Sequence, residues 1–186
     1  KEVTGVRIAS YGGMLLAAYQ GRPVEAEELV AATADDAFAR GDGRGLYFAD
    51  WATAILHNSL GHYRKALRAA EHAAEDDFAP YCGRALPELI EAAVRSGETA
   101  LAADGLRRLS ATVVEGSDWV AGLQARSRAL LIDGEPAERC YVEAVERLAR
   151  TRLRPDLARA HLLYGEWLRR ESRRVDARHQ LRTAYD

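Results

Sequence analysis

The chain has 186 residues, of which 48% are hydrophobic and 29% charged, so it is long enough to bury a core and too apolar for a disordered tail. Alanine occurs 35 times, proline 5 times and phenylalanine 3 times, which favours helices over a β-sandwich. The formal net charge of −2 gives no global reason to expect a nucleic-acid or membrane binder.

Helical periodicity extends along nearly the whole chain. Between residues 60 and 76, for example, apolar residues recur at spacings of three and four, as on one helix face. No segment alternates in the pattern of a strand. The breaks between helical segments contain Gly, Pro or Asp and lie at Gly21–Pro23, Gly41–Gly45, Gly61, Ala79–Pro80, Gly97, Gly116–Ser117, Asp133–Pro136 and Arg154–Pro155. They predict about ten helices joined by short turns, with neighbouring helices antiparallel.

Five turns align as a repeat, with the turn residue at Gly21, Gly61, Gly97, Ile132 and Ser172 and spacings of 40, 36, 35 and 40 residues. The residue five positions after the turn is Ala26, Ala66, Ala102, Ala137 or Ala177. Short side chains at fixed positions allow paired helices to approach closely. The stretch 61–66 (GHYRKA) is the clearest part of a pattern that resembles the tetratricopeptide repeat.

This pattern predicts an all-α fold without strands, a right-handed α-solenoid of about five antiparallel hairpins that forms one tetratricopeptide-like domain over residues 1–186. An irregular helical bundle is the alternative. The segment Gly41–Gly45 is expected to be the most flexible joint, a helix–helix loop rather than a phosphate cradle. Because the chain does not begin with Met and stops inside an apparent helix, we expect a piece of a longer protein.

The motif search finds no catalytic constellation, so we expect no enzyme activity, cofactor or metal. Neither Lys1 nor Lys65 follows a Walker A loop, no serine lies in a G-x-S-x-G elbow, and the five histidines form no H-E-x-x-H motif. His161 is predicted to be a packed histidine with a satisfied hydrogen bond, and Ser117 to begin a helix. The sequence has no apolar run long enough to span a membrane, and its two cysteines, Cys82 and Cys140, do not form a disulfide framework. We therefore expect a cytoplasmic protein.

Two surfaces are candidates for binding. Tyr47, Phe48 and Trp51 cluster near Asn58 and form either a groove floor or packing between hairpins. In tetratricopeptide-like folds the first helix of each hairpin lines the concave surface. The repeat alignment then implies a groove whose exposed positions include Tyr11, Trp51, Asn58, Arg84, Glu91, Arg95, Arg159, Glu166 and Arg169. The arginines among them favour an acidic or anionic partner.

The other candidate is the basic region from Arg139 to Arg182, which has 12 arginines against 6 acidic residues. Such charges line solvated helix faces or meet a polyanion. The densest run, 169–174 (RRESRR), lies at a hairpin and lacks the polar, base-reading pattern of a recognition helix. We therefore expect no direct contact with nucleic acid, and none with a membrane.

The last 36 residues carry a more specific likeness. The stretches 157–170 (LARAHLLYGEWLRR), 175–178 (VDAR) and 180–184 (QLRTA) resemble the segment before the DNA-binding module of large LuxR-type, MalT-like regulators of actinobacteria. The stretches 86–97 (LPELIEAAVRSG) and 126–131 (RSRALL) are similar to earlier parts of the same region. The likeness spans roughly residues 45–186.

The resemblance implies a sensor or scaffold domain of a LuxR-family transcriptional regulator. The helices would bind an inducer or a protein and mediate oligomerisation, while the ATPase and the helix-turn-helix DNA-binding domain would lie outside this chain. Self-association of the chain is a further expectation. A free-standing tetratricopeptide-like scaffold for protein–protein interaction is the alternative.

Overall fold

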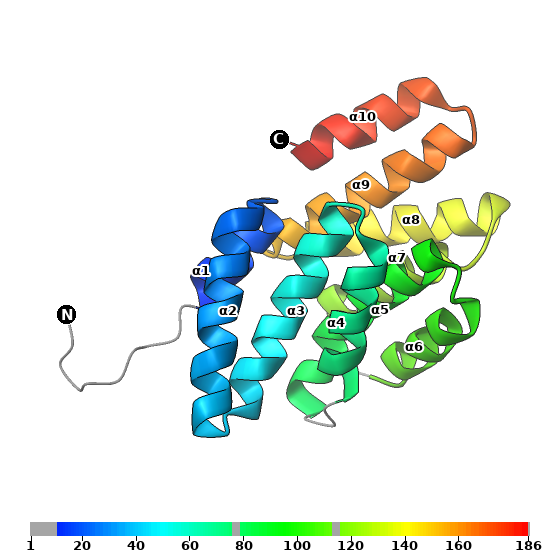
Figure 1. Cartoon of the computed structure of the whole chain (residues 1–186). Coiled ribbons are helices and arrows are strands. Elements are labelled where there is room, and N and C mark those ends of the chain that lie inside the picture. Colours follow the sequence, from blue (N-terminus) through cyan, green and yellow to red (C-terminus); the bar gives the residue numbers. More distant parts are fainter. Residues whose placement is uncertain (1–10, 76–78, 113–115, 186) are drawn as a thin grey trace. The chain divides into compact units, whose positions relative to one another are not determined.

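The computed structural model describes residues 11–75, 79–112 and 116–185, with the backbone alone for 79–82. In this part of the chain there are ten α-helices and no strand, which confirms the all-helical prediction (Figure 1). The helices are α1 (Tyr11–Tyr19), α2 (Pro23–Arg40), α3 (Gly43–Ser59), α4 (Tyr63–Glu75), α5 (Ala79–Ser96), α6 (Thr99–Ala111), α7 (Asp118–Ala129), α8 (Gly134–Ala149), α9 (Arg154–Arg170) and α10 (Arg174–Tyr185).

Four of the five aligned turns share one backbone geometry. In these four the amide that follows the turn residue donates to the carbonyl five residues back, as His62 does to His57 with an N···O distance of 2.8 Å. These bonds satisfy carbonyls that the end of a helix leaves open. Ser172 adopts the left-handed conformation of the turn with a φ of 62°, although it carries a side chain. In the fourth turn the left-handed residue is Gly134, two positions after the aligned Ile132.

Burial supports the repeat alignment. The five alanines that follow the turns, here called the register alanines, are each at most 3% exposed; they are Ala26, Ala66, Ala102, Ala137 and Ala177. A short side chain at such a buried position lets a helix approach its neighbour closely, and a longer one would push the helices apart. On α4, for example, Arg64 and Arg68 lie on the opposite side and are exposed.

The chain divides into two compact units, an N-terminal unit (Lys1–Glu98) and a C-terminal unit (Thr99–Asp186). The prediction of one repeat domain over residues 1–186 stays a prediction. In the N-terminal unit each helix packs against the next, and α3 also packs against α1 and α5 (Figure 1). Its core contains Met14, Tyr47, Trp51, Ile55 and Leu56.

In the C-terminal unit α7 packs on α8, α8 on α9, and α9 on α10. Tyr141 stacks on Tyr164 with 5.5 Å between the ring centroids. The Tyr164 hydroxyl donates to Glu138 at 2.9 Å, and burial followed by this bond raises the pKa of Tyr164 to about 12. Arg173, in the turn before α10, donates to the same Glu138 oxygen, and that bond is the main cause of a lowered Glu138 pKa. This cluster joins α8, α9 and the start of α10.

The expected loop at Gly41–Gly45 is mostly helix, which corrects the prediction of a flexible joint there. Helix α3 begins at Gly43, and Asp42 caps it by accepting a hydrogen bond from the Gly45 amide at 3.2 Å. Gly45 is buried where α2 and α3 meet, and a methyl group on it would lie 2.6 Å from the Ala37 Cβ. The glycine therefore permits close helix packing, and the linker between the helices is two residues long.

We predict that Gly45→Ala lowers the free energy of unfolding by about 1–3 kcal/mol, because the Ala37 Cβ is fixed to its backbone and α2 must move away. The control is Gly12→Ala in α1, where an added methyl group meets nothing within 4 Å. Chemical denaturation of both variants tests this expectation. A Gly45→Ala protein as stable as the Gly12→Ala control would contradict the close packing of α2 on α3.

Candidate functional site

The structure places the predicted groove residues in three different settings. Trp51, Asn58 and Glu91 are buried, with 7%, 3% and 2% of their surfaces exposed, so the expectation that they are exposed is wrong. They are covered because α3 packs against both α4 and α5, and these residues face that packing. Of the remaining six, Arg84 and Arg169 are exposed, and Tyr11, Arg95, Arg159 and Glu166 are partly exposed.

The aromatic cluster of α3 belongs to the hydrophobic core. Of the two interpretations, a groove floor or packing between hairpins, the structure therefore supports packing. Tyr47 and Trp51 are buried, and their ring centroids lie 6.3 Å apart. Phe48 stacks on Tyr11 of α1 with 4.7 Å between the centroids. The Tyr11 hydroxyl donates to the Asp42 carboxylate at 3.4 Å. These rings hold α1 against the first half of α3 and form no ligand floor.

Asn58 takes part in a buried polar contact between α3 and α5. Its side-chain amide donates to the Glu88 carbonyl at 3.0 Å and to the Glu88 carboxylate at 2.9 Å. Glu88 and Glu91, one turn apart on α5, are both buried. Carboxylates removed from water require such donors, because an unpaired buried charge is costly. Asn58 therefore has a structural role. The repeat alignment had instead placed it in a ligand-binding groove.

His57, beside Asn58, is also buried and has a pKa below the ordinary histidine value. Burial is the main cause, and the positive charges of Lys65 and His62 add to it. The neutral imidazole therefore packs in the N-terminal unit near the α3–α4 turn. The predicted hydrogen bond of His161 is confirmed, because its Nδ1 lies 2.6 Å from the Gln180 side-chain oxygen. Ser117 likewise caps α7 by accepting from the Val120 amide.

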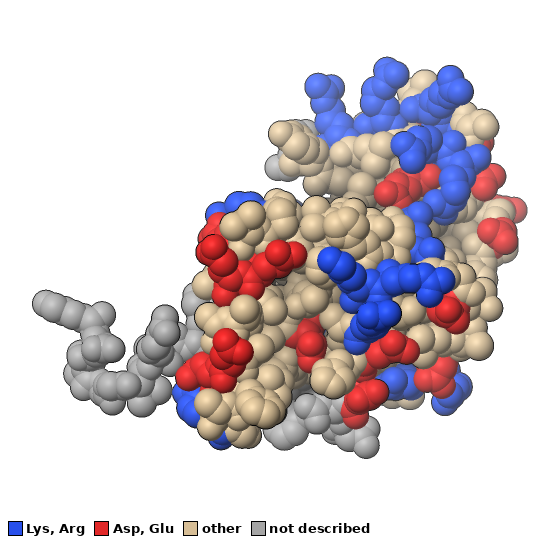
Figure 2. All heavy atoms as spheres, in the orientation of Figure 1, with Lys and Arg blue, Asp and Glu red and all other residues tan. Residues whose placement is uncertain are grey.

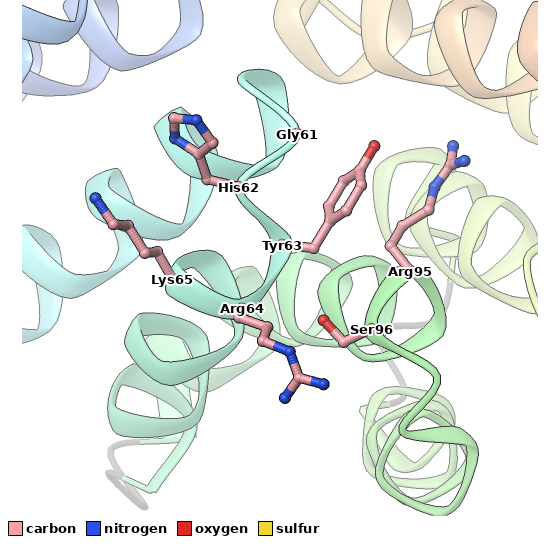
Figure 3. A pocket seen from close by; sticks show the side chains of 7 residues that line it. All are labelled: Gly61, His62, Tyr63, Arg64, Lys65, Arg95 and Ser96. Atoms are coloured by element: carbon pink, nitrogen blue, oxygen red, sulfur yellow. The ribbon is translucent and has the colours of Figure 1, made fainter.

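A pocket of about 510 Å³ lies in the N-terminal unit between the α3–α4 turn and the end of α5. Three of its seven lining residues are cationic, namely Arg64, Lys65 and Arg95, and the Arg95 guanidinium lies over the Tyr63 ring. Figure 3 shows that these side chains diverge, because Lys65 and Arg64 point away from the side on which Tyr63 and Arg95 lie together. The pocket can attract an anion, but its groups do not converge on one reacting atom.

A second cavity, here called the C-terminal groove, lies on α10 and the end of α9 and encloses about 470 Å³. Its floor contains Ala177 and Leu181. Four arginines surround that floor; they are Arg169, Arg174, Arg178 and Arg182. Within the described part of the chain none of the four forms an ion pair. Figure 2 shows this concentration of basic side chains over α10 and the adjoining end of α9.

Of the predicted groove residues, only Arg169 lines this cavity. Arg159 and Glu166, the other two on α9, are half-buried and engaged with partners. Sequence reasoning missed the contribution of α10, although a signal was present in the four-residue spacing of Arg174, Arg178 and Arg182. Such a spacing places three charges on one helix face.

Two further findings concern metals and membranes. No three His, Cys, Asp or Glu side chains within residues 11–75, 83–112 and 116–185 lie close enough together to hold a metal ion. None of the helices described here has the length and apolarity needed to cross a bilayer. Cys140, a free thiol, is partly buried against the core of the C-terminal unit, and the side chain of Cys82 lies outside the described residues.

We predict that Asn58→Ala lowers the free energy of unfolding by about 1–3 kcal/mol, because it removes two hydrogen bonds from buried acceptors of Glu88. The control is Arg44→Ala, an exposed change on the same helix that should stay within about 0.5 kcal/mol of the parent. Thermal and chemical denaturation measure both. An Asn58→Ala protein as stable as the control would contradict a stabilising role for these two buried hydrogen bonds.

Comparisons with protein-family models, curated proteins and solved structures return no match to this chain. Its function is therefore inferred from the surfaces described above. The two cavities are open and arginine-lined, and the buried polar groups of α3 and α5 are engaged with each other. This arrangement suits the binding of an acidic or anionic partner.

Proposed function

We propose that the chain is a binding scaffold of tetratricopeptide-like hairpins that serves as the sensor domain of a LuxR-family transcriptional regulator. In this proposal the hairpins stack as a right-handed α-solenoid, and they bind an inducer or a protein partner and mediate oligomerisation in the cytoplasm. The ATPase and the helix-turn-helix domain belong to other parts of the regulator. No catalytic step is assigned to this chain.

The observation that supports the scaffold most strongly is the burial of a short side chain at the same position of five hairpins. A repeated hairpin cannot bury its apolar face alone, so it stacks on its neighbours and leaves extended outer surfaces for binding. The unneutralised arginines of the C-terminal groove fit that use, since a guanidinium group recognises carboxylates and phosphates well. The assignment to a LuxR-type regulator draws on the resemblance of residues 45–186.

The proposed mechanism is a population shift. A ligand that binds one arrangement of the hairpins more tightly than another favours that arrangement in proportion to its differential affinity. The flanking domains would then be released or paired. The partner of this step is acidic or anionic, because the described cavities have cationic linings.

The reading frame of the natural gene on both sides of this chain tests the regulator assignment. We expect a G-x-x-x-x-G-K-[ST] phosphate-binding loop upstream and a helix-turn-helix downstream. Fluorescence anisotropy with labelled duplex DNA provides a second readout, in which the isolated chain should show no specific binding. A frame that encodes neither flanking domain would contradict the regulator and favour the free-standing scaffold.

A further inference from the structure

The C-terminal groove has the chemistry to hold a helix with acidic residues. Arg174, Arg178 and Arg182 follow one another at four-residue steps on α10, which separates them by about 6 Å along the axis. Carboxylates at the same helical spacing on a neighbouring helix would match that separation. The floor formed by Ala177 and Leu181 would meet short or apolar side chains between those carboxylates. A nucleic-acid backbone supplies negative charges, but its phosphates offer no apolar group that would pack on this floor.

Helix α2 presents an outer face of this kind. Val24, Glu28, Ala31, Asp35 and Phe38 are all exposed, and their offsets of 0, 4, 7, 11 and 14 place them in one stripe. Val24 and Phe38 are 70% and 80% exposed, unusually high values for large apolar side chains. Figure 2 shows acidic side chains along the part of the surface where α2 lies.

The two carboxylates of this stripe are available for new partners. Glu28 and Asp35 form no ion pair within the described residues, whereas the neighbouring acids Glu25 and Asp36 are paired with Arg22 and Arg40. The stripe therefore offers unneutralised negative charge between apolar side chains. The C-terminal groove offers unneutralised positive charge around an apolar floor. The two surfaces are complementary in charge and in apolar content.

The charge of the compact units reinforces this complementarity. The N-terminal unit has 10 Lys and Arg against 15 Asp and Glu, a net charge of −5. The C-terminal unit has 16 Lys and Arg against 13 Asp and Glu, a net charge of +3. Opposite charges on the two units steer a second molecule so that unlike units approach.

We propose that the occupant of the C-terminal groove is α2 of a second copy of this chain. The proposal deepens the self-association contained in the proposed function, by naming the two surfaces that meet. The surfaces differ, so the contact is heterologous: each bound pair keeps one free α2 and one free groove, and the assembly extends until a ring closes. A single helix in a groove buries less than a standard interface, so the association is weak and salt-dependent.

Sedimentation velocity of the full 186-residue chain over a range of concentrations up to about 10⁻³ M tests the contact. We expect the weight-average mass to rise with concentration at about 0.05 M salt and the apparent association to weaken at least about tenfold at 0.5 M. The groove variant is Arg178→Glu with Arg182→Glu, and the α2 variant is Glu28→Arg with Asp35→Arg. All four positions are exposed, so circular dichroism should show unchanged folding.

Each variant alone is expected to remain monomeric, because one of its two surfaces repels the intact one. An equimolar mixture of the two should associate again. The groove variant supplies an intact α2 and the α2 variant an intact groove, and the two charge-reversed surfaces are also complementary to each other. The matched control, Arg152→Glu with Arg154→Glu, changes two exposed arginines outside the groove and should associate like the parent. That variant separates the effect of the groove from a change in net charge.

Two results would overturn the proposal. One is a parent chain that stays monomeric at every concentration, and the other is association that survives in the groove variant. Binding of duplex DNA by the monomeric parent, lost in the groove variant, would replace the helix with nucleic acid as the occupant. These results concern one surface, and they leave the reading-frame test of the proposed function unaffected.

Discussion

Close approach of paired helices is the constraint on which the rest of this structure depends. The register alanines are buried at one equivalent position of the repeat, and in two of the helix pairs a glycine on the facing helix serves the same purpose. A methyl group on Gly122 would lie 2.6 Å from Leu148 Cγ, and one on Gly165 would lie 2.8 Å from Leu181 Cγ. Large side chains such as Tyr141 and Trp167 then fill the space beside the contacts. Because the inner faces are so closely packed, most charged residues lie on the outer faces, with Glu88, Glu91 and Arg126 as buried exceptions.

The features that sequence predicted well are local ones. The turns at Gly21, Gly61, Gly97 and Ser172 follow from residues that end a helix, and their hydrogen bonds involve neighbours within five positions. The Ser117 cap is equally local. The repeat alignment extended this local information along the chain, because the same spacing of small residues recurs and each recurrence requires a close helix contact.

The features that could not be predicted from the sequence depend on long-range packing, that is, on which helices contact each other. Asn58 and Glu91 were assigned to an exposed face by carrying a repeat pattern across, but α5 packs on α3 and covers Asn58, and Glu91 of α5 is buried as well. Gly45 was assigned to a loop because glycine is common in loops, whereas the packing of α2 requires it inside a helix. The C-terminal groove combines Arg169 of α9 with residues of α10, and only their juxtaposition makes a cavity. Long-range packing decided all three cases.

The measurement that tests the central claim most directly is the free energy of unfolding of five single variants, with leucine in place of each register alanine. Ala32→Leu and Ala103→Leu, at exposed positions of α2 and α6, serve as controls. If short side chains at these positions set the helix approach, each register variant loses about 1–3 kcal/mol while the controls stay within about 0.5 kcal/mol of the parent. Register variants as stable as the controls would contradict the account.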